Sequence, residues 1–269
     1  MRTILGLFIA ASATVIGCGS DNTAVVVTPA QANTVADASI AANSLAFGAL
    51  AIDPAAVVTP VPLAVDPAAQ AALNAVNAAP ANYTPSGCAT ATSTGQAVNY
   101  TFNNCAGPLG ATGINGTFVA TFSSMSDGIH VSMISAGLKV GMNTVNMNRQ
   151  GTFSQNGNSR SFLITGDTGS VNGPAGTINY TNTQGSLTWT AGSTCATYSA
   201  TENLSLNNAA LTVVHSNVMR CGSLCPQSGS VRVVDAGGGS IIITYGGTST
   251  ASFTESNGNA GSVSLACGG

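Results

Sequence analysis

The chain has 269 residues, and only 6% of them are charged, against about 25% in ordinary soluble domains. The formal net charge is −3 and Lys139 is the only lysine, so the sequence lacks the basic surface that binds nucleic acid or anionic lipid headgroups. Serine, threonine, asparagine and glycine must therefore supply most of the polar surface.

The first 17 residues have the features of a secretory signal peptide. Arg2 is the only charged residue before Asp21, and an apolar run of 13 residues extends from Ile4 to Ile16. A positive start, a short apolar core and a small residue before the cleavage site define such a signal. Crossing a bilayer takes about 20 apolar residues, so we expect residues 1–17 to be a cleaved signal rather than a membrane-spanning helix.

The sequence Val15-Ile16-Gly17-Cys18 resembles the lipobox of bacterial lipoproteins. That resemblance implies a diacylglycerol on the Cys18 sulfur, cleavage before Cys18, and acylation of the new amine, for example with palmitate. The alternative is an ordinary signal peptide with a chance cysteine. Residue 19 is Gly and not the Asp that retains such proteins at the inner membrane, so the resemblance implies a lipid anchor in the outer membrane of a Gram-negative host.

Residues 18–85 are rich in Ala, Val and Pro, and we expect a low-complexity tether with short helices. Asp66 as N-cap and Pro67 at the first helical position predict a helix that ends before Pro80. A weaker helix is predicted over residues 31–50, where an apolar stripe contains Val35, Ala38, Ala42, Leu45 and Ala49. Because short alanine-rich helices are marginal alone, these either dock or leave the segment a flexible stalk.

Residues 86–269 alternate apolar and polar side chains with period two, which is typical of half-buried strands. Turn signals such as Asp127-Gly128, Gln155-Asn-Gly157, Asn172-Gly-Pro174 and Gly237-Gly-Gly239 separate the strands. The pattern predicts an all-β domain, an antiparallel β-sandwich or barrel-like fold. The predicted strands cover residues 98–102, 118–122, 129–133, 138–142, 145–147, 161–165, 177–181, 186–190, 197–206, 211–215, 231–234, 240–245, 249–254 and 263–267.

Six cysteines follow Cys18, an even number that predicts disulfides in an exported protein. Sequence alone does not fix their connectivity. Cys88 and Cys105 flank one predicted strand, Cys195-Ala-Thr repeats the local sequence Cys88-Ala-Thr, and Cys225 and Cys267 flank the last group of strands. We therefore predict the pairs Cys88–Cys105, Cys195–Cys221 and Cys225–Cys267.

No nucleophile elbow, phosphate-binding loop or calcium loop occurs, and we predict neither a catalytic site nor a cofactor. His215, Cys221 and Cys225 have the spacing of zinc ligands, although disulfides are favoured outside the cytosol. Glu202 and Glu255 are the only glutamates. We interpret Glu202 as a solvated strand residue. The two histidines, His130 and His215, are placed on the polar sides of their strands, and Met133 and Met142 in the core.

These features favour a non-enzymatic, lipid-anchored cell-envelope protein with a structural or adhesion-like binding role, whose partner is an envelope protein or a polysaccharide. The texture resembles that of Ser/Thr/Gly-rich lipoproteins of predatory and social Gram-negative bacteria. The alternative is a secreted carbohydrate-binding module or hydrolase on a β-sandwich. A concave sheet face that brings Trp189 together with Tyr180 or Tyr198 and a nearby glutamate would favour that alternative.

Overall fold

The computed structural model describes residues 27–50, 66–174, 176–222, 225–265 and 267. The predicted signal peptide and Cys18 lie outside the described residues. None of the described helices is both long enough and apolar enough to cross a membrane.

The prediction of an all-β antiparallel fold is confirmed. The described strands form one sheet in the order β1 to β13, and each pairs with the next in an antiparallel ladder. The strands are β1 (Ala89–Thr94), β2 (Ala97–Cys105), β3 (Ile114–Met125), β4 (Gly128–Val140), β5 (Asn143–Asn156), β6 (Ser159–Gly173), β7 (Gly176–Thr190), β8 (Cys195–Leu206), β9 (Ala209–Cys221), β10 (Ser228–Asp235), β11 (Ser240–Thr244), β12 (Thr250–Glu255) and β13 (Ala260–Ser264).

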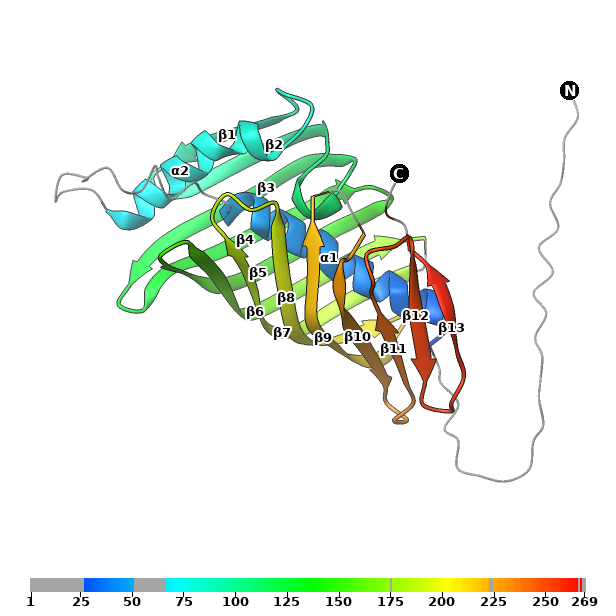
Figure 1. The fold of residues 1–269 in the computed structure, drawn as a ribbon. Helices are drawn as coiled ribbons and strands as arrows, with labels where there is room; N and C mark the ends of the chain where they lie inside the picture. Colours follow the sequence, from blue (N-terminus) through cyan, green and yellow to red (C-terminus); the bar gives the residue numbers. More distant parts are fainter. Residues whose placement is uncertain (1–26, 51–65, 175, 223–224, 266, 268–269) are drawn as a thin grey trace, which may run out of the picture.

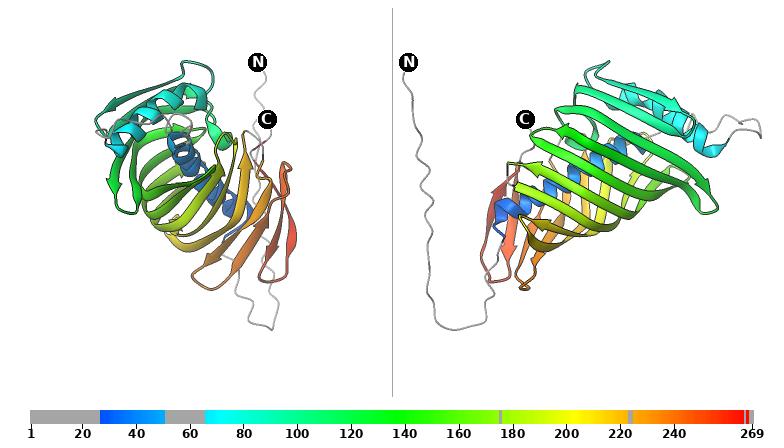
Figure 2. Two further views of the ribbon diagram at one scale, coloured as in Figure 1. Left: turned by 60° about the vertical axis from the view of Figure 1, so that its left-hand side comes forward. Right: turned by 180° about the vertical axis from the view of Figure 1, so that it is seen from behind.

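The sheet curls around helix α1 (Pro29–Leu50), which lies in its hollow (Figures 1 and 2). The two ends of the strand order, β1 and β13, are not hydrogen-bonded to each other, so the sheet stays open. Of the two predicted architectures, the barrel-like one describes this arrangement better, because a single sheet wraps its own core. The concave face therefore lines the interior, and the convex face carries the exposed Ser, Thr and Asn side chains.

Helix α1 begins at a capping box. The backbone N–H of Thr28 donates to the Gln31 side chain at 2.9 Å, and the Thr28 hydroxyl accepts from the Gln31 N–H at 3.3 Å. The predicted apolar stripe is buried, but small residues outside that stripe, such as Ala32, Ala36 and Ala46, are buried as well. The helix is thus enclosed by the fold rather than laid on its surface.

Helix α2 (Pro67–Asn82) begins as predicted, since the Asp66 side chain accepts from the Ala68 N–H at 3.0 Å. The predicted stop before Pro80 is wrong, because the helix continues through Pro80 to Asn82. The helix packs against β1, β2 and β3 at the first end of the sheet.

Both helices share one hydrophobic core with the sheet. Buried residues of α1, α2 and the strands belong to a single cluster. The predicted boundary near Pro85 therefore divides one core, and within residues 27–50 and 66–82 the N-terminal segment belongs to the folded unit instead of forming a free stalk.

The three disulfides join the predicted pairs. Cys88–Cys105 links the residue before β1 to the last residue of β2, and Cys195–Cys221 joins residues that lie directly opposite each other in β8 and β9. Cys225–Cys267 connects the segment before β10 to the segment after β13. Together they fasten the sheet at both ends and in its middle.

Candidate functional site

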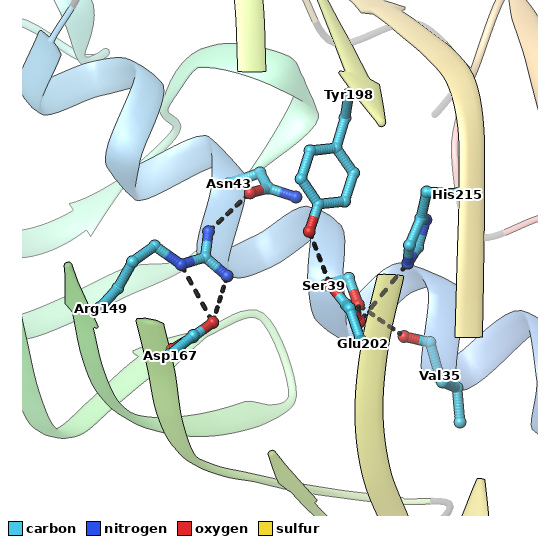
Figure 3. Close-up of polar contacts among 8 residues, drawn as sticks. All are labelled: Val35, Ser39, Asn43, Arg149, Asp167, Tyr198, Glu202 and His215. Atoms are coloured by element: carbon cyan, nitrogen blue, oxygen red, sulfur yellow. Dashed lines mark hydrogen bonds and ion pairs between the residues drawn. The ribbon is translucent and has the colours of Figure 1, made fainter. Parts of the chain in front are cut away.

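Charged side chains gather inside this sparsely charged protein. Five of them are buried among the described residues: Arg149, Arg160, Asp167, Glu202 and Asp235. Burying a charge is costly unless it is paired or hydrogen-bonded, so such a concentration needs a compensating structure. Arg149, Asp167 and Glu202 converge on the concave face beneath α1 (Figure 3).

Glu202 on β8 is the centre of the first group. Its Oε1 accepts a hydrogen bond of 2.6 Å from the Tyr198 hydroxyl, and its Oε2 accepts one of 2.5 Å from the Ser39 hydroxyl of α1. The Nε2 of His215 on β9 lies 3.4 Å from the same Oε2. Glu202 is completely buried, so its carboxylate binds two strands and the helix together within the core.

Electrostatics keep this carboxylate ionised. Burial acts to raise the pKa of Glu202, but the charge of the nearby His215 and the hydrogen bonds from Ser39 and Tyr198 outweigh it and lower the pKa to about 2. Burial and the Glu202 carboxylate raise the pKa of Tyr198 well above its ordinary value. The tyrosine hydroxyl therefore stays protonated and remains a donor.

Arg149 on β5 is the centre of the second group. Its Nε donates to Oδ2 of Asp167 on β6 at 3.0 Å, and its Nη2 donates to the same oxygen. Its Nη1 donates to Oδ1, the side-chain amide oxygen, of Asn43 on α1 at 2.6 Å. Burial raises the pKa of Asp167, and the ion pair with Arg149 acts in the opposite direction. Each group thus offers one charged side chain to α1.

Aromatic rings continue the same face. Trp189 on β7 pairs in register with Ala196 on β8, and Tyr198 follows two residues later on the same side of the sheet. The Phe47 ring of α1 lies edge-on to Trp189 with ring centroids 5.3 Å apart. The concave face therefore combines a carboxylate, a guanidinium and aromatic rings, and α1 contacts all three.

The structure places two sequence-predicted residues differently from expectation. Glu202 was expected to be solvated and His215 to lie on the polar side of its strand, yet both are buried and face each other. The alternation of apolar and polar residues along β8 and β9 could have predicted that both side chains are buried. His215 shares its side of β9 with Leu211 and Val213, and Glu202 shares its side of β8 with Ala200 and Leu204.

The predicted metal and glutamate candidates separate in space. Cys221 and Cys225 lie in two different disulfides, so neither is available as a zinc ligand beside His215. No cluster of three or more His, Cys, Asp or Glu suited to a metal ion occurs in the described part of the chain. Glu255 lies at the end of β12, where its Oε2 accepts hydrogen bonds from the Asn257 and Asn259 side chains, whereas Glu202 on β8 is bonded to Tyr198 and Ser39.

The predictions for His130 and for the two methionines, Met133 and Met142, have different outcomes. His130 is half-buried beside Asp127 at 2.7 Å, outside the site, which agrees with its predicted polar side. Met133 is buried as predicted. The prediction that Met142 lies in the core is wrong, because Met142 follows the end of β4 and its side chain is 81% exposed.

Arg149, Asp167, Ser39 and Asn43 are site residues that sequence reasoning missed. Arg149 follows Val145 and Met147 on the buried side of β5, which could have marked it. Nothing local marks Ser39 or Asn43, because their role depends on which face of α1 meets the sheet.

Comparisons with protein-family models, with curated proteins and with solved structures find no match for this chain. The site must therefore be interpreted from its own chemistry.

Proposed function

We propose that this protein is a lipid-anchored cell-envelope protein with a binding role, exported by its signal peptide and held at the outer membrane through Cys18. The observation that carries the proposal is the pairing of all six later cysteines in disulfides, in a chain whose residues 15–18 resemble a lipobox. Disulfides persist in exported proteins and are rare in the cytosol. Two or three acyl chains would make a firm anchor, since each buried CH₂ contributes about 0.8 kcal/mol.

The position of α1 supports a domain held close to the bilayer. Pro29 follows Cys18 by eleven residues, which reach at most roughly 40 Å when fully extended. A non-enzymatic role agrees with the state of Glu202, whose two oxygens are engaged by Tyr198 and Ser39 inside the core.

Carbohydrate binding is the second candidate. The observation that favours it is the presence of Trp189, Tyr198 and Glu202 on one concave face, the arrangement named above as its criterion. Aromatic faces stack on the apolar side of sugar rings, and buried carboxylates bond their hydroxyls.

Labelling and fractionation test the anchor. Cells that express the full chain are fed radiolabelled palmitate, and membranes are separated by density. We expect labelled protein in the outer-membrane fraction and none after Cys18→Ser. Cys88→Ser, which removes a cysteine of the β domain, is the control and should stay labelled. Equal labelling or equal membrane association of the Cys18→Ser chain would contradict the proposal.

A further inference from the structure

Helix α1 presents three different chemical groups to the concave face from one side. Ser39, Asn43 and Phe47 are spaced by four residues, so they share a side of the helix along about 12 Å of its axis. Ser39 gives a hydroxyl to Glu202, Asn43 gives an amide carbonyl to Arg149, and Phe47 gives an apolar ring to Trp189. A hydroxyl, an amide carbonyl and an apolar ring face are the groups that an N-acetylated sugar also carries.

Most of the side chains that α1 buries are apolar, such as Val35, Leu45 and Leu50, but the contact with the sheet also includes polar side chains. Serine and asparagine bond charged side chains where a permanent core would place aliphatic residues, and charged groups are ordinarily depleted at interface cores. The contact is also incompletely satisfied. Both ring nitrogens of His215 and the side-chain amide oxygen of Asn33 are buried without a hydrogen-bond partner among the described residues. Buried polar atoms without partners weaken such a contact.

No disulfide joins α1 to the sheet. The three disulfides join cysteines between residues 88 and 267, so apart from the continuous polypeptide chain, noncovalent contacts hold α1 against the sheet. The antiparallel ladder from β1 to β13 does not include α1 either. The disulfides and the strand hydrogen bonds thus stabilise the sheet without involving the helix.

We propose that the concave face is a binding site for an N-acetylated oligosaccharide and that α1 occupies it as a displaceable internal substitute for that ligand. This deepens the binding role proposed above and rests on it. Glu202 receives sugar hydroxyls, Arg149 donates to an acetamide carbonyl, and Trp189 stacks on a sugar ring. Ser39, Asn43 and Phe47 hold these positions until the ligand displaces the helix.

The proposal predicts competition between α1 and the ligand. When only a fraction of molecules has the helix displaced, the apparent dissociation constant rises by the inverse of that fraction. Phe47→Ala and Asn43→Ala weaken the helix contact without touching the sheet, so both should bind ligand more tightly. A purely structural role for these residues would give no such gain.

The experiment is calorimetric titration of the detergent-solubilised full chain with N,N′,N″-triacetylchitotriose, with circular dichroism to confirm that each variant is folded. We expect Phe47→Ala and Asn43→Ala each to lower the apparent Kd at least about fivefold. Trp189→Ala should raise it by about tenfold or more, as expected for loss of a stacking ring. Phe253→Ala, a matched phenylalanine on β12, should leave the affinity unchanged, and cellotriose, which lacks acetamides, should bind more weakly.

Several results would overturn the proposal. They are an absence of binding in the natural chain and in both loosened variants, equal affinity in the Trp189→Ala chain, or equal affinity for cellotriose. If Phe47→Ala does not fold, Asn43→Ala alone decides, since it removes only a side-chain amide. The titration does not depend on lipidation, so failure to label Cys18 would count against the anchor alone, and failure to bind sugar would leave the anchor standing.

Discussion

At the scale of single residues, the ionisation of Glu202 couples stability to pH. Its pKa is about 2 in the folded protein, against an ordinary value of 4.5. A carboxyl whose pKa falls on folding stabilises the folded state fully above about pH 4.5, and this contribution is lost as the pH falls toward 2. At 1.36 kcal/mol per pH unit, the expected loss is about 3 kcal/mol.

Urea unfolding between pH 5 and pH 2 measures this dependence. Glu202→Gln should be less stable than the natural chain at pH 5 and should lose less of its stability on acidification. Glu255→Gln, the only other glutamate, is the control and should retain the natural acid slope. Parallel curves for Glu202→Gln and the natural chain would refute this prediction.

The Arg149–Asp167 pair predicts a large cost when one partner is removed. Arg149→Ala leaves Asp167 buried without its cation and Asn43 without its donor. Breaking a buried ion pair in this way costs about 3–5 kcal/mol. Lys139→Ala, which removes an exposed lysine bonded to Thr144, should cost less than about 1 kcal/mol. Urea midpoints at neutral pH compare the two, and similar midpoints would show that the buried pair is dispensable.

The inward residues of the site were partly predictable. Period-two alternation places Arg149 with Val145 and Met147, and His215 with Leu211 and Val213, on buried sides. Residue type argued the other way, because charged and imidazole side chains are ordinarily exposed. Their pairing across strands depends on register and on α1, which local sequence does not encode.

At the scale of elements, the sequence located most strands and misjudged some limits. Residues 129–133 and 138–142 were predicted as two strands, but 129–133 and 138–140 belong to one strand, β4, whose register shifts between Ser135 and Leu138. Residues 177–181 and 186–190 likewise form β7, which shifts between Tyr180 and Asn182. An irregular register interrupts the alternation without ending the strand. β1 was missed, because its Ala, Thr and Ser residues give no apolar alternation.

The seat of α1 depends on a glycine. An added Cβ at Gly48 would run into the Tyr83 side chain, close to its hydroxyl. Alanine favours a helix over glycine by about 1 kcal/mol, yet overpacking a filled site costs about 1–3 kcal/mol. We therefore expect Gly48→Ala to lower the free energy of unfolding despite its better helix propensity.

A double-mutant cycle with Tyr83→Phe checks the cause. Removing the hydroxyl makes room beside residue 48, so the double variant should regain part of the stability lost by Gly48→Ala. Additive losses would show that the alanine acts elsewhere.

At the scale of the whole molecule, the fold separates into a disulfide-fastened sheet and an inserted helix that it encloses. The all-β class followed from the alternation, the presence of disulfides from the even cysteine count, and the chosen pairs from the positions of the cysteines relative to the predicted strands. The curl around α1 did not, because it depends on contacts between segments far apart in the chain, such as Ser39 with Glu202 and Asn43 with Arg149. Helix α1 fills the concave side of the open sheet with side chains, which the inward-facing side chains of a closed sheet would otherwise do.

This arrangement predicts complementation in trans. A chain of residues 66–269 retains α2, every described strand and all three disulfides, so its far-ultraviolet circular dichroism should keep the strand signal. Without α1, the apolar part of the concave face is exposed, and the chain should bind a hydrophobic dye.

A synthetic peptide of residues 27–50 should suppress dye binding and gain helicity on mixing, because an isolated short helix is marginal until it packs. A peptide with Asn43→Ala and Phe47→Ala should bind at least about tenfold more weakly, since it lacks the bond to Arg149 and the ring on Trp189. A fragment that loses its strand signal would mean that helix and sheet fold only as one unit. A double-substituted peptide that binds equally well would mean that the Asn43 and Phe47 contacts do not hold the helix to the sheet.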